Sequence, residues 1–197
     1  MARRKFLDKV PDPERIPDNE KFQELILFIA ERSEGDRPFG ATKLNKLLFY
    51  ADFLAFLTLG KAITWQPYQK LENGPAPRRL LPVASEMEEE EVIAYTERDY
   101  YGKRQRRMLA LRTPDLSMFS GPEVQLVNDI IEEFWGKSAS DMSEISHDFI
   151  GWELAKLGED IPYEVALVTC QEPPAKYLKE GIKLEPAAKD CLRKNVR

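Results

Sequence analysis

The sequence predicts an α+β fold that is predominantly helical. Its helices are expected to pack around a central buried helix at about 42–59, with a small antiparallel sheet that includes a hairpin at about 92–112. In the segment 44–59, 12 of 16 residues are apolar, and a helix that is apolar on nearly every side must be surrounded by protein. The segments 22–29 and 124–134 each carry an apolar stripe with helical spacing. Alternating residues at the two ends of 92–112 are typical of paired strands.

The first two helices have recognisable ends. Asp18 or Asn19 is expected to cap the first helix, because either side chain can accept a hydrogen bond from a free amide of the first turn. Its buried stripe consists of Phe22, Leu25, Ile26 and Ile29. Gly35 predicts the end of this helix. Thr42 is the predicted cap of the central helix and Gly60 its stop signal.

A short extended region is predicted after the central helix. Residues 63–71 favour a strand because they include Trp and Tyr, and Pro67 indicates that this strand is short or lies at a sheet edge. The Asn-Gly-Pro-Ala-Pro segment at 73–77 predicts a rigid corner, since a glycine is followed by two residues with fixed φ. A further helix is expected to run from Pro82 to about Glu90.

The register of the hairpin follows from a two-residue loop at Tyr101-Gly102. This loop places four pairs of residues opposite one another: Ile93 and Ala110, Tyr95 and Met108, Glu97 and Arg106, and Asp99 and Arg104. Two of the pairs carry opposite charges, which stabilise cross-strand pairing by about 0.2–1 kcal/mol each.

The remaining part of the chain is predicted to be helical. Ser120 and Glu123 have the spacing of a capping box at the start of the helix with the stripe at 124–134. Ser138 or Ser140 is expected to begin the next helix, and 145–157 a further helical segment. The Pro-rich arm at 1–17, the domain at 18–168 and a polar tail at 169–197 are the predicted divisions of the chain.

Composition excludes several classes of site. His147 is the single histidine, so no metal site that needs two histidines can form. Cys170 and Cys191 are too few for a disulfide scaffold or a cysteine metal cage. No glycine-rich phosphate-binding motif is present, and we expect neither a metal nor a cofactor. The longest apolar run, at 25–30, is too short to span a membrane, and we expect a cytoplasmic protein.

Three clusters of polar residues are candidate sites. The acidic run at 86–91 is interpreted as a solvated helix end. The net charge of −5 and the acidic neighbours of the basic cluster at 103–107 favour an ion-paired surface over a nucleic-acid interface. Adjacent residues on a helix point about 100° apart, so Ser146 and His147 cannot form a catalytic Ser–His pair. The sequence therefore predicts no catalytic residues and no enzyme.

The segment TKLNKLLFYADFL at 42–54 resembles the opening motif of the Panacea domain, the SocA-like antitoxin family. A Gly-Pro element and a Ser-His element followed by Trp agree with this family in order and spacing over about 42–155, although Ala76 stands where the family has Val. The residues that carry the resemblance are Lys43, Leu44, Lys46, Leu47, Tyr50, Ala51, Asp52, Gly74, Pro75, Ser146, His147 and Trp152.

The resemblance implies a bacterial or phage antitoxin that neutralises a protein toxin, encoded by the adjacent gene, through direct contact. It implies no catalytic residues. Exposed positions at the hairpin tip and in the tail are the expected contacts: Tyr101, Arg104, Arg106, Arg107 and Tyr177. Two alternatives stay open, namely an adaptor that delivers a bound protein to a protease and a nucleic-acid-binding regulator. The oligomeric state is not predicted.

Overall fold

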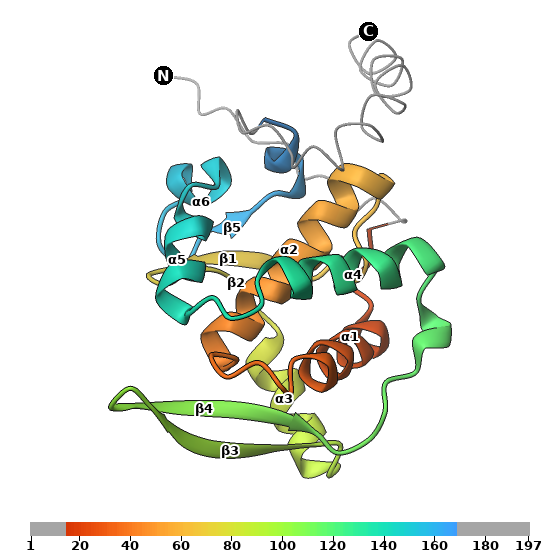
Figure 1. Ribbon diagram of the computed structural model, residues 1–197. Coiled ribbons are helices and arrows are strands. Elements are labelled where there is room, and N and C mark those ends of the chain that lie inside the picture. The colour runs from red at the N-terminus through yellow and green to blue at the C-terminus, as the bar shows by residue number, and fades with distance from the viewer. Residues whose placement is uncertain (1–14, 169–197) are drawn as a thin grey trace, which may run out of the picture.

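The computed structural model describes residues 15–168 (Figure 1). The helices are α1 (Asn19–Arg32), α2 (Ala41–Leu59), α3 (Leu80–Glu89), α4 (Gly121–Glu133), α5 (Ala139–His147) and α6 (Ile150–Leu154), with 3₁₀ turns η1 (Leu116–Met118) and η2 (Tyr163–Val168). The strands are β1 (Tyr68–Leu71), β2 (Gly74–Pro77), β3 (Ile93–Tyr100), β4 (Lys103–Ala110) and β5 (Asp160–Ile161). The predicted tail at 169–197 and most of the predicted arm lie outside the described residues.

The helix α2 lies at the centre of the molecule, as predicted. It contacts α1, α4, α5, β2, β4 and η2 (Figure 1). One side of α2 packs in the main core with α1, α3 and α4. The other side contributes Phe49, Phe53 and Phe56 to a second cluster that also contains Tyr68 and Ile161. The helix-dominated α+β fold is therefore confirmed, and α2 joins two hydrophobic clusters.

The ends of α1 and α2 agree with the sequence in most details. The Asp18 carboxylate accepts a hydrogen bond from the amide of Lys21, which confirms the predicted cap. Gly60 ends α2 with a φ of +80°, a conformation that favours glycine. The predicted cap Thr42 lies inside the first turn of α2, and Gly40 takes the cap position instead. Within residues 15–168 no helix is long and apolar enough to cross a lipid bilayer.

The structure corrects the prediction for 63–77. The predicted strand begins only at Tyr68, because Trp65 has a φ of +56° and Pro67 has no amide proton for a ladder. The predicted corner at 73–77 is the strand β2, which pairs antiparallel with β1. The order β2-β1-β5 makes β2 an edge strand, where its two prolines leave no ladder bond unmade.

The hairpin β3–β4 has the predicted register, with Ile93 opposite Ala110 and Asp99 opposite Arg104. Tyr101 and Gly102 form its loop with φ values of +52° and +75°, as a type I′ turn requires. The hairpin forms a two-stranded sheet of its own, separate from β2-β1-β5. Figure 1 shows it at the lower end of the molecule, with β4 toward the helices and the loop projecting beyond them.

The second half of the domain contains two capping boxes, one at Ser120–Glu123 as predicted and one that begins at Ser138. The predicted helical segment at 145–157 is interrupted between α5 and α6. Phe149 adopts an extended conformation there, and its ring packs 5.1 Å from the ring of Phe49 in the second cluster. The break lets this partly buried ring pack against the second cluster, which the sequence pattern did not show.

Candidate partner-binding site

The helix α2 contains buried charges that its apolar composition did not predict. The Lys43 ammonium lies 2.6 Å from the Asp36 carboxylate and donates to the carbonyl oxygens of Phe134 and Lys137 at 2.6 and 3.0 Å. Burial lowers the pKa of Lys43, and the Asp36 carboxylate opposes that shift. All three donors of the ammonium group are therefore used to join α2 to the segment before it and to the end of α4.

A second buried lysine joins three elements. The Lys46 side chain, 1% exposed, donates to the Pro75 carbonyl at 3.1 Å. A Cβ atom at Gly74 would lie 2.5 Å from the Lys46 nitrogen and 2.3 Å from the hydroxyl oxygen of Ser146. The residues Lys46, Gly74, Pro75 and Ser146 thus meet where α2, β2 and α5 pack together, and only glycine fits at position 74.

Among residues 15–168 the Lys46 ammonium group has a single hydrogen-bond acceptor, and burial lowers its pKa from 10.5 to about 7. Between about pH 7 and pH 10.5 the unfolded state therefore binds more protons, so this group makes the protein more stable as the pH rises through that window. The slope is at most about 1.4 kcal/mol per pH unit. We expect wild type to gain stability relative to Lys46→Met when denaturant unfolding is measured from about pH 7 to pH 10. A constant difference between the two proteins over this range would contradict the assignment.

Asp52 fixes the chain that follows α2. Its carboxylate accepts hydrogen bonds from the amide and the hydroxyl of Thr64 at 2.7 and 2.6 Å and from the hydroxyl of Tyr68 at 2.9 Å. Burial raises the pKa of Asp52, and these donors oppose that shift. The Tyr68 hydroxyl oxygen also lies 2.8 Å from the Leu48 carbonyl oxygen, so its single proton is shared between that carbonyl and the Asp52 carboxylate. Asp52 consequently holds 64–68 against α2 and positions β1.

The other residues of the motif are packing residues. Leu44, Leu47 and Ala51 belong to the main core. The ring of Tyr50 stacks on Phe134 at 4.8 Å. These contacts place the whole opening motif of α2 inside the fold, where it has structural partners.

In the Ser-His-Trp element, the histidine and tryptophan rings stack on each other and the serine is buried. The His147 ring lies 3.8 Å from the Trp152 ring at an angle of 10°, and the Trp152 indole donates to the Leu71 carbonyl at 3.0 Å. Ser146 is fully buried and donates to the Ser143 carbonyl. The stacked rings of His147 and Trp152 and the hydrogen bond of the indole join α5 and α6 to β1. Among residues 15–168 no group of three His, Cys, Asp or Glu side chains is arranged to hold a metal ion.

The residues predicted to contact a partner have different environments. Tyr101 is 89% exposed at the hairpin loop, and the Arg104 side chain is 87% exposed. Arg107 is 1% exposed and donates to the carbonyl oxygens of Ser33, Glu34 and Asp36. The prediction that Arg107 contacts a partner does not fit this burial, because its guanidinium closes the turn after α1. Tyr177 lies outside the described residues.

The contrast between two arginines in β4 can be measured. We expect Arg107→Ala to lower the free energy of unfolding by about 3 kcal/mol, because three buried carbonyl groups lose their donor. Arg104→Ala is expected to change it by less than about 0.5 kcal/mol, since this side chain is solvated. Chemical denaturation of both variants checks the assignment, and equal losses would contradict it.

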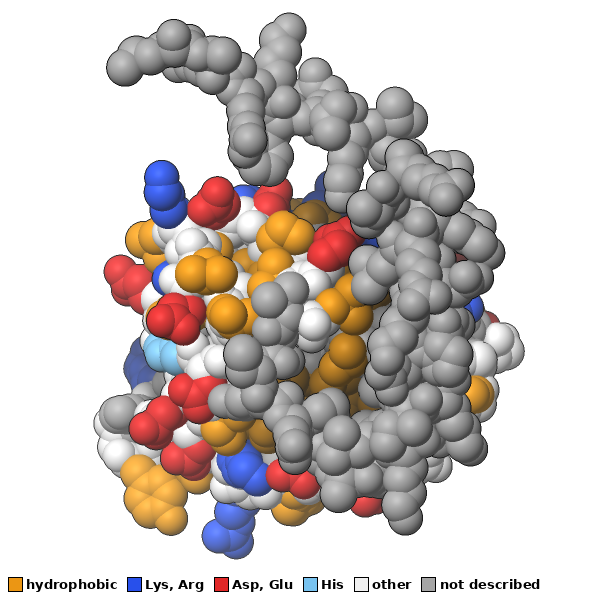
Figure 2. All heavy atoms as spheres, turned by 90° about the horizontal axis from the view of Figure 1, so that it is seen from above, with side chains coloured by type: hydrophobic (Ala, Val, Ile, Leu, Met, Phe, Trp, Pro, Cys, Tyr) orange, Lys and Arg blue, Asp and Glu red, His pale blue; other side chains and the backbone are white. Residues whose placement is uncertain are grey.

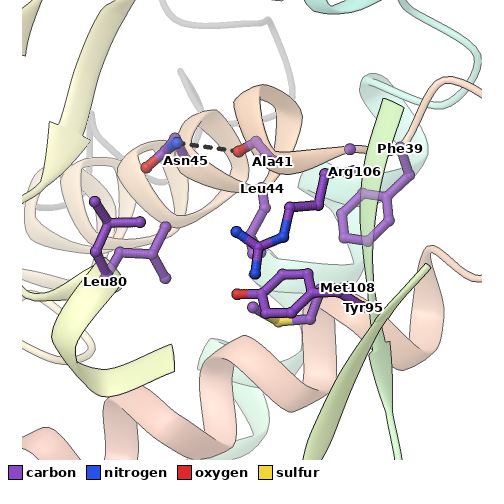
Figure 3. A pocket seen from close by; sticks show the side chains of 10 residues that line it. Phe39, Ala41, Leu44, Asn45, Leu80, Tyr95, Arg106 and Met108 are labelled. Carbon is purple, nitrogen blue, oxygen red and sulfur yellow. Dashed lines mark hydrogen bonds between the residues drawn. The ribbon is translucent and has the colours of Figure 1, made fainter. Parts of the chain in front are cut away.

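A small pocket lies between the hairpin, α2 and α3 (Figure 3). It has a volume of about 60 Å³, and its apolar lining includes Leu44, Leu80 and Met108. The Arg106 guanidinium lies over the Tyr95 ring at 3.6 Å and pairs with Glu88 at 3.8 Å, so it turns away from Glu97, its predicted cross-strand partner. Arg104 pairs with Glu97 instead, at 3.5 Å. Within the basic cluster, Arg104 and Arg106 are thus paired with acidic residues and Arg107 is buried.

The end of the molecule opposite the hairpin has a surface of different composition. Figure 2 looks down on the end formed by α5, α6 and η2, and hydrophobic and acidic side chains are mixed there. The exposed hydrophobic residues include Leu154, Leu157 and Leu167, and the exposed acidic residues include Glu153 and Glu159. This acidic face is a second surface that a partner could contact.

Comparison with known families identifies the class of protein that the helical fold and the motif define. The family model described as antitoxin SocA-like, Panacea domain, matches residues 44–153. Because this match covers more than half of the chain, the chain belongs to the antitoxin SocA-like family. The match includes every residue of the predicted motif except Lys43. The comparisons with curated proteins and with solved structures found no match.

Proposed function

We propose that this chain is an antitoxin that neutralises a protein toxin by binding it directly and covering its functional surface. The family supports an antitoxin role. The observation that carries the contact mode is the hairpin β3–β4, which projects from the helical body and exposes Tyr101 and Arg104 at its end (Figure 1). Exposed Tyr and Arg side chains on a preformed element are typical anchors of protein interfaces.

The buried motif supports the same proposal. Lys43, Lys46, Asp52 and Ser146 are polar motif residues, and each is engaged inside the fold. The His147 ring stacks on Trp152. We interpret the motif as the support of a scaffold and the hairpin as its contact surface. The pairing of Arg104 and Arg106 with acidic residues, together with the burial of Arg107, supports a protein partner over nucleic acid.

The proposal is tested by co-expression with the product of the adjacent gene. We expect that product to arrest growth alone, and the wild-type chain to restore growth and co-purify with it. The double variant Tyr101→Ala, Arg104→Glu is expected to lose at least about 10-fold in affinity, which corresponds to about 1.4 kcal/mol. Lys156→Glu, a charge reversal between α6 and β5 at the far end of the molecule, is the matched control and should bind as wild type does.

Other outcomes would reject the proposal. If the neighbouring product is harmless, or if the wild-type chain neither restores growth nor binds it, the chain is not its antitoxin. A bound partner that becomes short-lived in cells would instead indicate the adaptor. A salt-sensitive complex with promoter DNA in the absence of the partner would indicate the nucleic-acid-binding regulator.

A further inference from the structure

The hairpin offers a partner more than exposed side chains, because one of its edges is open. In an antiparallel pair, residues alternate between those whose amide and carbonyl groups bond across the pair and those whose groups point away. The Leu111 amide donates to the Val92 carbonyl at 2.9 Å, which fixes the alternation. It follows that the backbone groups of Tyr95, Glu97 and Asp99 point away from β4.

The two outer edges of the hairpin differ. The edge of β4 lies against the segment before α2, where a Cβ atom at Gly40 would lie 3.4 Å from the Arg106 carbonyl oxygen. Figure 1 shows β3 on the side away from the helical body. Among residues 15–168 the outward amide and carbonyl groups of Tyr95, Glu97 and Asp99 have no hydrogen-bond partner. An open edge of this kind is a template for a strand from another chain.

The charges along this edge restrict what can pair with it. Glu97 and Asp99 lie on one face of the hairpin and Arg98 on the other. The Glu97 side chain is 61% exposed, and its ion pair with Arg104 is a solvated surface pair.

A second copy of β3 in the antiparallel register centred on Glu97 would place Glu97 opposite Glu97, and the next register toward the loop would place it opposite Asp99, where like charges are destabilising. The register centred on Thr96 would place Glu97 opposite Tyr95, which gives the carboxylate no basic partner. A strand with basic residues at two alternate positions would instead pair favourably with both carboxylates.

We infer that the outer edge of β3 binds an extended strand of the toxin, and that this strand carries basic residues opposite Glu97 and Asp99. The inference rests on the proposed function, since the toxin is the occupant. Backbone hydrogen bonds to Tyr95, Glu97 and Asp99 supply affinity, and the two carboxylates select the sequence of the added strand. Tyr101 and Arg104 then lie at one end of the enlarged sheet.

Amide hydrogen exchange of the ¹⁵N-labelled full chain tests the inference. In the free protein we expect slow exchange at Thr96 and Arg98, whose amides bond to β4, and fast exchange at Tyr95, Glu97 and Asp99. In the complex with the co-purified toxin, exchange at these three residues should slow by about 10-fold or more. Continued fast exchange in a saturated complex would overturn the inference while leaving the proposed function standing. Protection already present in the free chain, rising with its concentration, would assign the edge to a second copy and would also overturn it.

Two substitutions of Glu97 distinguish the contribution of its backbone amide from that of its side-chain charge. Glu97→Pro removes an outward amide and leaves the bonds to β4 intact, and an edge strand tolerates proline. Glu97→Gln keeps the amide and removes the charge. We expect toxin affinity to fall about 10-fold or more for the proline variant and by a smaller factor for the glutamine variant. Circular dichroism checks that both fold, and wild-type affinity in a folded Glu97→Pro protein would overturn the inference. If the wild-type chain binds no toxin, the proposed function fails and this inference fails with it.

Discussion

Replacement of Asp36 by alanine is expected to lower the free energy of unfolding by about 3–5 kcal/mol, which is a large part of the stability of a typical domain. The reason is that Lys43 would keep a buried ammonium group after losing its counterion at 2.6 Å. The Asp36 carboxylate also accepts a hydrogen bond from the amide of Gly136 at 3.0 Å, so the variant also detaches the end of α4. Denaturant unfolding monitored by circular dichroism measures the loss.

Two comparisons identify the cause of that loss. Glu34→Ala removes an exposed carboxylate from the same segment, and we expect it to change stability by less than about 0.5 kcal/mol. The double variant Asp36→Ala, Lys43→Met removes both charges and should be no less stable than Asp36→Ala alone, because no unpaired charge remains buried. If the double variant loses as much stability as Asp36→Ala and Lys43→Met lose together as single variants, the two residues act independently. That result would contradict the buried ion pair.

The second large effect is expected at Gly74. Gly74→Ala would place a methyl group 2.3 Å from the Ser146 hydroxyl oxygen and 2.5 Å from the Lys46 nitrogen, at a φ of +101°. Overpacking costs about 1–3 kcal/mol and the left-handed conformation about 1–2 kcal/mol, so the total loss should be about 2–5 kcal/mol. The variant should separate β2 from α2 and α5, with a lower thermal midpoint.

Gly60→Ala is the matched control for this prediction. Gly60 has a φ of +80°, and nothing lies within 4 Å of an added Cβ atom, so only the conformational cost of about 1–2 kcal/mol applies. Addition of Ser146→Ala to the Gly74→Ala protein should recover part of the lost stability, because it removes the nearest atom. Equal losses for the two glycine variants would refute the proposed close contact at Gly74.

The sequence predicted the parts of the fold that depend on local patterns. The register of the hairpin followed from its loop and from the alternation of charges, and α2 was recognised because its apolar residues occur on every side. The predicted strand at 63–71 is too long, because Trp65 has a left-handed conformation and its ring packs against Phe56 and the distant Tyr163. The corner at 73–77 proved to be a strand for a related reason, since its pairing with β1 is a tertiary contact.

The candidate site was predicted less completely. The burial of Lys43 depends on Asp36 and on carbonyl groups beyond α4, and that of Lys46 on a carbonyl group in β2. None of these partners belongs to the apolar helical segment that contains the two lysines, so the pattern of that segment does not reveal them. Arg107 could have been separated from Arg104 and Arg106 by strand alternation alone, because residues 104 and 106 share one face of β4 and residue 107 has the other.

The most direct test of the account is to map which amides of the full chain become protected from hydrogen exchange when the toxin binds. The central claim is that the buried motif supports the fold and that the hairpin contacts the partner. It predicts that protection appears at 95–104 and that exchange in α5, α6 and η2 stays as in the free chain. Protection confined to α5, α6 and η2, with an unchanged hairpin, would contradict the claim and assign the toxin to the acidic face.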